Sequence, residues 1–573
     1  MKMIYNSKKE IIENHLSLSN IGARRKKSTK DHLFVINGII NERIKRRSTE
    51  GIDIVFYNIC QAFDSLWAER TLLDVFKNGV NDNMLNLLHE GTKSVDIRVK
   101  TPMGETEVKT IQDIILQGES FSSLLCTSSV DLMSQESTGP VFKYRRKLEI
   151  PKLSFVDDLA DIQICGKDTI LMNRYTVEEV EKRRLQFAAH KCKRMHVGKQ
   201  NNECPDIQIN EWKIEEDKDE NTTEKEDEYC VGEIPIKSVK KQEYLGSILA
   251  HDGKNEENIK SRVSKGQGIV NDILAILNNV HFGDFYIDAF ILLRQSLLLS
   301  VLLYDIEIVY NLSLKDIMKL ESIDYQLSRR VLAVSSKSSK AILMLELSLC
   351  PIRFHIMKKR LLYCHFLLTT DSDNLAKSVL LQQISDPIRG DFAYALQNDL
   401  VTLNLAHLTF EKIKGFSKIE FKRIVTKQME EAAFKYLLSE KNKLKKSQRL
   451  IYTNFSRQDY LKSGSNLSKT AVQNIYCVRS ESLEVASNYS TKYKDNLLCP
   501  HISCPGEDSQ QHLYSECEYF KISEKSDNNT LYEEIFGCNT GKLSFISKRI
   551  FKAYKQRNDY LSFQQTRRDP EEP

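Results

Sequence analysis

Two adjacent carboxylates interrupt an apolar stretch and could bind a metal ion. Asp157 and Asp158 lie in LSFVDDLADIQIC, a run of apolar and β-branched residues at positions 153–165. Paired acids in such a run have two explanations: a hairpin that turns its acidic tip to water, or strands that hold the acids against a cation. Carboxylate oxygens are the hard ligands that Mg²⁺ prefers. The rest of the sequence has to decide between a solvated turn and a magnesium site.

A second group of metal-ligating residue types lies near the C-terminus, in CPHISCPGEDSQQHLYSEC. Four residues separate Cys499 from Cys504, seven separate Cys504 from His512, and four separate His512 from Cys517. Three thiolates and one imidazole suit tetrahedral Zn²⁺, and the gaps within each pair fall in the usual range. His501 is a rival to Cys504 for one of the four positions. We expect a small zinc knuckle here.

The apolar pattern predicts the elements that must position these groups. Residues 51–58 (GIDIVFYN) form a short β-branched run typical of a buried strand. Residues 97–114 alternate around a Pro-Met-Gly-Glu turn and predict a hairpin. From about residue 258 to 480 the periodicity is helical almost throughout, and the last ninety or so residues are rich in Ser, Asn and Cys. After the first strand, apolar residues recur at helical spacing, namely Phe63, Leu66, Trp67, Leu73 and Phe76. An α+β fold with a long helical region is therefore predicted.

The composition is that of a folded globular protein of several domains. The chain has 573 residues, of which 41% are hydrophobic and 28% are charged. The longest apolar stretch, residues 289–304, is too short to cross a bilayer and contains Arg294. The N-terminus lacks a signal-peptide core, and thirteen cysteines without a secretion signal indicate a reducing compartment. We expect an intracellular protein of the cytoplasm or nucleus, with no membrane partner.

The net charge of +5 conceals a strongly basic chain. Residues 211–228 carry a net charge of −7, so the remainder carries +12. That acidic segment has the composition of a solvated, flexible loop. Basic runs occur at residues 23–30, 42–47, 143–147 and 441–449. Each alone is typical of a solvated face, but together they favour a polyanionic partner such as nucleic acid.

Five segments occur in an order that resembles the palm motifs of reverse transcriptases from non-LTR retrotransposons. They are QAFDSLW after the first strand, LQGESFSSLLCT, FVDDLAD, AAHKCKRMHVGK and YLGSILAHDG. The resemblance covers about residues 15–265. A later phrase, LMLELSLCPIRFHI, looks like the region that follows the palm in one animal lineage of these elements. The resemblance implies a right-hand polymerase palm, which would use strands to position the paired acids.

The implied reaction is RNA-templated addition of deoxynucleotides to a DNA 3′ end. Two Mg²⁺ ions would stabilise the attacking and leaving oxygens, and the partners would be an RNA template, a DNA primer or target, and dNTPs. In the resemblance, Asp157 and Asp158 hold the metals at a hairpin tip, with Asp157 the stronger candidate for a direct ligand. Lys191, in AHKCK, matches a family lysine placed near the triphosphate.

Three further residues match positions that bind the substrate in the family. Phe63 resembles the aromatic that closes the sugar pocket and excludes a 2′-hydroxyl, although its spacing also fits a core phenylalanine. Gln117 and Gly118 resemble the element along which template and incoming nucleotide lie, where glycine allows close backbone approach.

One position departs from the family in a way that affects chemistry. The first metal-binding aspartate of the family lies five residues before the aromatic of the AFD element, and in this chain that position is Asn58. An amide oxygen brings no charge to a dication. A thousandfold loss of rate corresponds to only about 4 kcal/mol of transition-state stabilisation, a plausible cost of losing one such ligand. Asp53, about 16 Å along the same strand, and Asp64 are poor substitutes.

A second departure concerns the fingers. Arg24, Arg25 and Lys26 stand where the family has a Gly-aromatic-Arg segment, so phosphate contacts are expected there although the aromatic is missing. Only about twenty residues precede this segment. The chain therefore resembles an N-terminally truncated copy of a retrotransposon reverse transcriptase, with no space for an upstream endonuclease.

The resemblance divides the chain into consecutive domains. We expect partial fingers at 1–50, a palm at 51–255 with the acidic loop 211–228 inserted, and a helical thumb-like region at 256–360. A helical C-terminal region would follow at 361–480, then the CCHC zinc knuckle at 481–525 and a basic tail helix at 526–573.

Three functions are compatible with these observations. The first is a reverse-transcriptase-like enzyme that uses Mg²⁺ and Zn²⁺, with activity impaired by Asn58 and the incomplete fingers. The second is a non-enzymatic nucleic-acid binder that keeps the basic groove and the knuckle. The third is a helical interaction scaffold with one structural zinc, unrelated to polymerases. Primer extension and salt-dependent RNA binding separate them.

Overall fold

The structure is a computed structural model of the whole chain. It describes residues 13–568 except for 23, 47–49, 64, 81, 113–114, 116–121, 137–138, 200–206, 215–227, 281–284, 372, 445–448, 464, 466, 484, 486–487, 489–496, 521–534 and 537–539. The chain forms two compact units. The first comprises Met1–Asn258, Glu307–Leu312 and Tyr363–Asn398, and the second comprises Ile259–Ile306, Ser313–Leu362 and Asp399–Pro573. The predicted segments 256–360 and 361–480 thus each contribute residues to both units.

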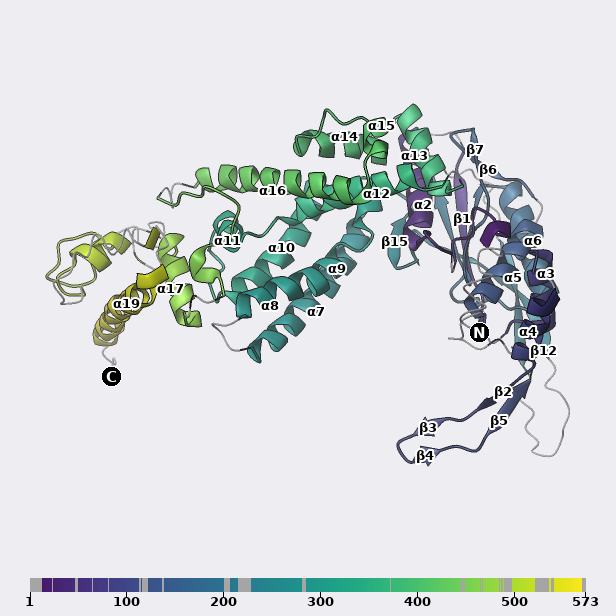
Figure 1. Cartoon of the computed structure of the whole chain (residues 1–573), viewed down its shortest axis with the longest axis horizontal. Coiled ribbons are helices and arrows are strands. Elements are labelled where there is room, and N and C mark those ends of the chain that lie inside the picture. The colour runs from purple at the N-terminus through teal and green to yellow at the C-terminus, as the bar shows by residue number, and fades with distance from the viewer. Residues whose placement is uncertain are drawn as a thin grey trace. The chain divides into compact units, whose positions relative to one another are not determined.

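The first unit contains a five-stranded sheet with helices on both faces (Figure 1). Its strand order is β13 (Lys237–Ser238), β10 (Lys193–Val197), β1 (Ile52–Asn58), β9 (Asp158–Ile164) and β8 (Leu153–Phe155). All neighbouring strands are antiparallel except β10 and β13, which are parallel. Together with its helices, this sheet makes the unit α+β, as the sequence predicts.

The central strand β1 is buried because both of its faces are covered. Val55 and Tyr57 point into a core shared with α3 (Ala68–Lys77), α5 (Ser122–Glu136) and α6 (Lys167–Lys182). Phe56 faces the other way, where its ring lies 5.2 Å from that of Tyr244. Helix α2 (Thr29–Lys45) and helix α13 (Leu375–Ser385) lie on that second side of the sheet (Figure 1). The strand predicted at residues 51–58 is confirmed.

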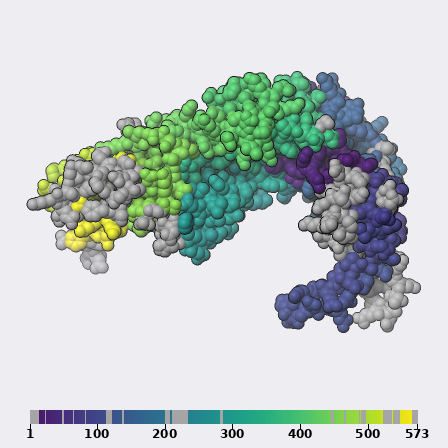
Figure 2. All heavy atoms as spheres, in the orientation of Figure 1, coloured from purple at the N-terminus to yellow at the C-terminus, as the bar shows by residue number. Residues whose placement is uncertain are grey.

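Two local predictions near this strand have different outcomes. The hairpin is confirmed: β2 (Ser94–Ile97) pairs with β5 (Lys109–Gln112), β3 (Lys100–Thr101) pairs with β4 (Gly104–Glu105), and the arm projects from the unit (Figures 1 and 2). The prediction that apolar residues recur at helical spacing after β1 is wrong in part. Helix α3 begins only at Ala68 and buries Leu72 and Val75, whereas Leu73 and Phe76 are exposed. The turn after β1 shifts the helix phase, so the spacing counted from Phe63 does not continue.

The acidic segment 211–228 is only partly a loop. Glu211–Ile214 belong to β11 (Gln208–Ile214) and Glu228 begins β12 (Glu228–Pro235), and the two strands pair as an antiparallel hairpin. Aromatic and β-branched residues such as Trp212 and Ile214 favour strand despite the acidic composition. The remaining positions, 215–227, lie outside the described residues.

The second unit is helical in its described residues, as predicted for positions 258–480. It contains most of α7 (Glu256–Asn278), then α8 (Tyr286–Leu293), α9 (Leu299–Leu302), α10 (Leu314–Val331), α11 (Lys340–Leu347), α15 (Phe410–Gly415), α16 (Lys418–Asn442), α17 (Lys469–Arg479) and α19 (Thr540–Arg568). Buried charges hold these helices together. Glu346 in α11 accepts hydrogen bonds from Tyr460 (2.7 Å) and from Arg479 Nη2 (2.9 Å). Among the described helices, none has the length and apolarity needed to cross a bilayer.

Candidate functional site

The pairing of β1 with β9 brings Asn58 opposite Asp158. The register runs from Ile52 opposite Ile164 to Asn58 opposite Asp158, so both residues lie at the same end of the sheet. The Asn58 side-chain nitrogen donates a hydrogen bond to Oδ1 of Asp158 at 3.0 Å. The position where the family carries a carboxylate is therefore in direct contact with the acid pair, through a hydrogen bond that the amide donates.

A tight turn presents Asp157 at the tip of the β8–β9 hairpin. Phe155 pairs with Asp158, which leaves only Val156 and Asp157 in the turn. Val156 has a φ of 56°, a conformation that costs about 1–3 kcal/mol for a β-branched residue. Gly22 is packed against this turn, because a Cβ there would lie 2.8 Å from the Val156 backbone nitrogen. The surrounding packing fixes a strained turn that holds the two acids side by side.

Burial and neighbouring charges shift the protonation of Asp158. Burial raises its pKa, and the negative charge of Asp157 raises it further. The Asn58 hydrogen bond and the positive charge of Lys191 act in the opposite direction, and the pKa remains above its usual value. A partly buried acid beside a second acid is an arrangement that a bound cation would stabilise.

The segment that carries Lys191 joins this end of the sheet through backbone contacts. The carbonyl oxygen of Asn58 accepts a hydrogen bond from the Ala188 N–H at 2.8 Å, and the Ala188 carbonyl accepts one from the Lys191 N–H at 2.8 Å. The Lys191 side chain is exposed. The structure thus brings Asn58, Asp157, Asp158 and Lys191 together, although Asn58 and Asp158 are 100 residues apart in the chain.

The other predicted substrate-binding residues lie elsewhere or serve the core. Phe63 is half-buried and packs against the core beside β1. Arg24 is turned inward, since its Nη1 donates to the carbonyl oxygens of Ser17 (2.6 Å) and Asn20 (2.9 Å). Burial lowers the pKa of Arg24. The Arg25 backbone N–H donates to the carboxylate of Glu13 at 3.1 Å.

Three positions considered in the sequence fall outside the described residues, namely Asp64, Gln117 and Gly118.

Asp53 belongs to a separate buried network rather than to the acid pair. Its carboxylate accepts hydrogen bonds from Arg194 (2.7 Å), from Thr169 (2.9 Å) and from His196 Nδ1 (3.0 Å). Burial raises the pKa of Asp53, but these three hydrogen bonds outweigh it and hold the pKa below its usual value. Cys165 also lies close enough to share a metal with Asp53 and His196. Because Arg194 already supplies a cation to the same carboxylate, the network is an ion-paired core and not a metal site. Sequence reasoning missed it.

The four predicted zinc ligands form one cluster. The ligand atoms of Cys499, Cys504, His512 and Cys517 all lie within 4.8 Å of one another. Cys504 Sγ is 3.2 Å from His512 Nε2, and Cys499 Sγ is 3.8 Å from Cys517 Sγ. Burial, with a further effect from the neighbouring sulfurs, raises the pKa of Cys499 to about 12. A dication reverses this cost by stabilising the thiolates. Donor set and spacing fit Zn²⁺, which this cluster could bind.

Local backbone features shape the cluster. The Cys499 N–H donates to the Gly506 carbonyl at 2.7 Å, which folds the first two cysteines into a short loop. A Cβ on Gly506 would lie 2.1 Å from the ring of His512, so only glycine fits there. The Cys517 N–H donates to the His512 carbonyl at 2.7 Å and closes the second half. Glu516 lies 3.5 Å from His512 Nδ1, where it orients the ring with Nε2 toward the sulfurs.

His501, the rival ligand, has a different place. Its ring stacks on Tyr519 with centroids 3.6 Å apart and an interplanar angle of 13°. Its other stacking partner is Tyr560 of α19, at 5.0 Å. Cys504 therefore completes the cluster, and His501 joins the zinc-binding loop to α19.

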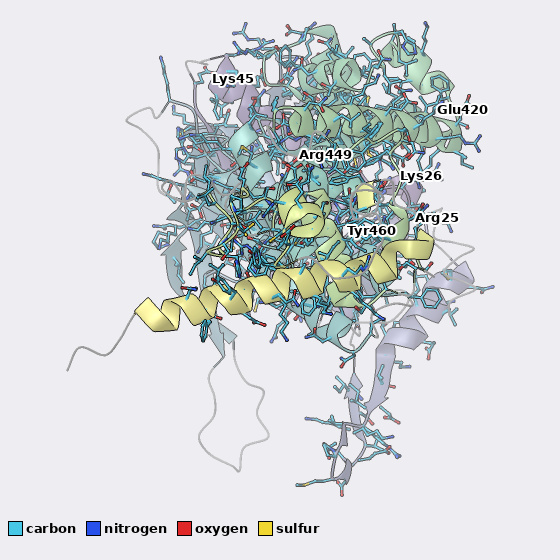
Figure 3. The ribbon with its side chains drawn as sticks, turned by 90° about the vertical axis from the view of Figure 1, so that its left-hand side faces the viewer. Arg25, Lys26, Lys45, Glu420, Arg449 and Tyr460 are labelled. Carbon is cyan, nitrogen blue, oxygen red and sulfur yellow. The ribbon has the colours of Figure 1, made fainter. Side chains whose placement is uncertain are left out.

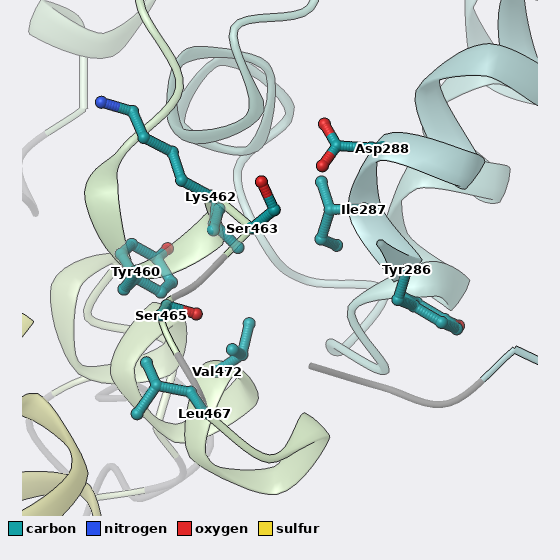
Figure 4. A pocket seen from close by; sticks show the side chains of 10 residues that line it. Tyr286, Ile287, Asp288, Tyr460, Lys462, Ser463, Ser465, Leu467 and Val472 are labelled. Carbon is teal, nitrogen blue, oxygen red and sulfur yellow. The ribbon is translucent and has the colours of Figure 1, made fainter. Parts of the chain in front are cut away.

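A pocket in the second unit is too small for an organic ligand (Figure 4). It lies between α8 and the segment 460–472, and its volume is about 20 Å³, room for roughly one water molecule. The Asp288 carboxylate at its edge is paired with Arg457 at 2.8 Å. It is therefore not a candidate active site.

Comparisons with known proteins add little to this geometry. No protein-family model matches the chain, and no curated protein matches it in sequence. Among solved structures, the chain is weakly similar to telomerase from Candida albicans in complex with the TWJ fragment of telomeric RNA. The identity is 11% and the TM-score is 0.27, over 71% of this chain and 54% of the telomerase chain. The chain thus spans about half the length of that protein.

Proposed function

We propose that this chain is a reverse-transcriptase-like, nucleic-acid-binding protein of a non-LTR retrotransposon, whose polymerase chemistry is weakened at one metal-binding position. The observation that carries the proposal is the contact of Asn58 with Asp158 beside Asp157, at one end of an antiparallel sheet. In such a palm, rigid strands give the acids little freedom to move. The ordered motifs in the sequence support the reaction class, and the acid pair at this end of the sheet supports a cation site.

The residues of the proposed site have distinct roles. Asp157, at the strained tip, would bind divalent cations, and half-buried Asp158 would share them. Lys191, exposed nearby, would bind the triphosphate. Two Mg²⁺ ions would supply Lewis acidity and bring the attacking hydroxyl and the α-phosphate together. Asn58 contributes a neutral amide, so the site holds one negative charge fewer than the family pattern.

A second candidate is a nucleic-acid binder without polymerase activity. The observation that favours it is the direction of the Asn58–Asp158 hydrogen bond, in which the amide nitrogen satisfies one carboxylate oxygen. A carboxylate that accepts this bond offers fewer lone pairs to a metal. In this version the basic surface and the zinc-binding loop remain, and no nucleotide is added.

Primer extension on an RNA template with Mg²⁺ separates the two candidates. The wild-type chain is compared with Asn58→Asp, and Asn58→Asp combined with Asp157→Asn is the matched control. We expect extension by Asn58→Asp at least about a hundredfold faster than by the wild type, corresponding to about 2.7 kcal/mol, and none by the control. If neither the wild type nor Asn58→Asp extends the primer while both still bind RNA, the chain is a nucleic-acid binder without polymerase activity.

A further inference from the structure

The C-terminal helix α19 is anchored on one side and open on the other. Its inward residues Ile550, Ala553 and Arg557 are buried. Arg557 forms a two-pronged ion pair with Asp508 of the zinc-binding loop, in which Nε donates at 2.8 Å. The stack of Tyr560 on His501 adds a second attachment. These contacts fix which face of α19 meets solvent.

The open face of α19 carries lysines and aromatic rings together. Lys548, Lys552 and Lys555 are exposed and lie one turn apart, because residues at i, i+4 and i+7 share a helix face. Phe551 is 46% exposed and Phe563 is 53% exposed on the same face. Helix α19 is the yellow helix in the foreground of Figure 3. We call these five residues the lysine–phenylalanine face.

The three lysines repel one another without compensation in the part of the chain that the structure describes. None of them has an ion-pair partner there, and Asp559, one turn beyond Lys555, forms no ion pair with it. Like charges at i and i+4 destabilise a helix, and a large exposed aromatic ring loses the benefit of burial. An anionic ligand with flat apolar rings relieves both costs at once.

We propose that the lysine–phenylalanine face of α19 binds single-stranded nucleic acid. Phosphates would contact Lys548, Lys552 and Lys555, and bases would stack on Phe551. The chemistry of the face matches alternating phosphates and aromatic bases. It does not match a bilayer surface, because a membrane-surface helix separates its apolar face from its lysines. Here the apolar face is already packed on the zinc-binding loop, and the lysines lie among the phenylalanines. The proposal does not depend on catalysis at Asp157 and Asp158.

The first test measures binding of the full-length, zinc-loaded chain to a fluorescein-labelled oligothymidine as a function of salt. We expect Lys548→Gln/Lys552→Gln/Lys555→Gln to bind at least about tenfold more weakly at low salt, with the log–log salt slope reduced by about 2. The matched control, Lys412→Gln/Lys414→Gln/Lys418→Gln, removes three exposed lysines, two from α15 and one from the start of α16. It should bind like the wild type. Equal losses in both triple variants would overturn the proposal.

A second measurement locates the bound strand directly. Oligothymidine containing 5-iododeoxyuridine is crosslinked to the wild-type chain, and the crosslinked peptides are identified by mass spectrometry. Crosslinks to Phe551 support the proposal, and Phe551→Ala should weaken binding about fivefold or more while zinc content is unchanged. Crosslinks confined to other segments contradict it. The proposal is also contradicted if Lys548→Gln/Lys552→Gln/Lys555→Gln loses affinity for phosphatidylserine vesicles or for a polyglutamate peptide but not for the oligothymidine. Asp157→Asn should abolish primer extension and leave oligothymidine binding unchanged. Failure of this proposal can therefore be distinguished from failure of the polymerase proposal.

Discussion

The Asn58 amide donates a hydrogen bond to Oδ1 of Asp158 at 3.0 Å, across the pair of central strands that end at this point. The two side chains differ from a pair of carboxylates by one charge and almost no volume. Since burial and Asp157 already raise the pKa of Asp158, a second carboxylate at position 58 would add repulsion that the amide avoids. Asn58 thus stabilises the cation-free protein relative to an aspartate at the same position.

The first prediction concerns this exchange of stability for cation binding. In EDTA, Asn58→Asp should lower the unfolding temperature of the first unit, because two like charges meet in a partly buried site. A cost of roughly 1–2 kcal/mol corresponds to a decrease of about 2–8 °C. Added Mg²⁺ should restore the variant and leave the wild type almost unchanged, since a ligand stabilises only the state that binds it. Differential scanning calorimetry with and without Mg²⁺ at equal ionic strength measures both effects.

The control for this prediction is the double variant Asn58→Asp/Asp157→Asn, which restores the original number of charges at the site. It should show a smaller loss in EDTA and a smaller response to Mg²⁺. Equal stabilisation of the wild type and Asn58→Asp by Mg²⁺ would show that position 58 does not affect cation binding.

The second prediction concerns the pH dependence of the sheet around His196. Its Nδ1 lies 3.0 Å from the Asp53 carboxylate and its Nε2 lies 3.1 Å from the Lys199 carbonyl oxygen. Both neighbours only accept hydrogen bonds, so both ring nitrogens must carry hydrogen and the ring is an imidazolium. The hydrogen bond with Asp53 raises the pKa of His196 above its usual 6.5. Its stabilisation is complete below that value and is lost as the pH rises through the folded-state pKa.

Native-state hydrogen exchange of β1 and β10 measures this contribution. At pH 6, His196→Gln should lower the opening free energy of these strands by about 1–2 kcal/mol, because one charge-assisted hydrogen bond is lost. Above the raised pKa, the difference between wild type and variant should shrink. His89→Gln, at an exposed position, serves as the control and should show no pH-dependent difference. A constant difference across the pH range would mean that His196 is neutral in the fold.

What the sequence could predict depends on how far apart the partners lie. Strand β1, the projecting hairpin and the zinc cluster follow from patterns within about twenty residues, where periodicity and turn residues act locally. The pairing of Asn58 with Asp158 was predicted from a resemblance in motif order and not from the spacing of the residues. Arg194 and Asp53 are 141 residues apart, and Arg557 and Asp508 are 49 apart. No local pattern signals such pairs, because tertiary folding alone selects them.

The third prediction concerns zinc and the attachment of α19. Zinc should bind with a stoichiometry of one per chain, and Cys504→Ser should abolish it, because Cys504 completes the ligand cluster. Loss of the ion frees two buried thiols and one half-buried thiol and loosens the loop that holds Arg557 and Tyr560. We expect the amides of residues 547–564 to exchange at least about tenfold faster in the chelated protein, a change of about 1.4 kcal/mol in opening free energy. Hydrogen exchange with mass spectrometry measures this.

The matched control for the zinc prediction is His501→Phe. Phenylalanine preserves the aromatic stack with Tyr519 and Tyr560 while removing both ring nitrogens. This variant should bind zinc like the wild type and keep α19 protected. Loss of zinc in His501→Phe, with zinc retained in Cys504→Ser, would show that the histidine and not the cysteine is the ligand.

The fourth prediction concerns the buried charge in the second unit. Glu346 accepts hydrogen bonds from Tyr452 (2.5 Å), Tyr460 (2.7 Å) and Arg479. Arg479 is also buried, so Glu346→Gln removes the carboxylate that pairs with its guanidinium in a buried site. Removing one partner of a buried pair costs about 3–5 kcal/mol. We expect the free energy of urea unfolding of the second unit to fall by that amount, whereas Glu431→Gln, on an exposed surface, should change it by less than about 0.5 kcal/mol.

Proteolysis tests the same network. Because Arg479 also donates to the carbonyl oxygens of Ile535 and Phe536, Glu346→Gln should make the chain at these two residues the first site of cleavage. Cleavage that begins instead in α16, or an unchanged urea midpoint, would show that the network is not what joins α11 to α17.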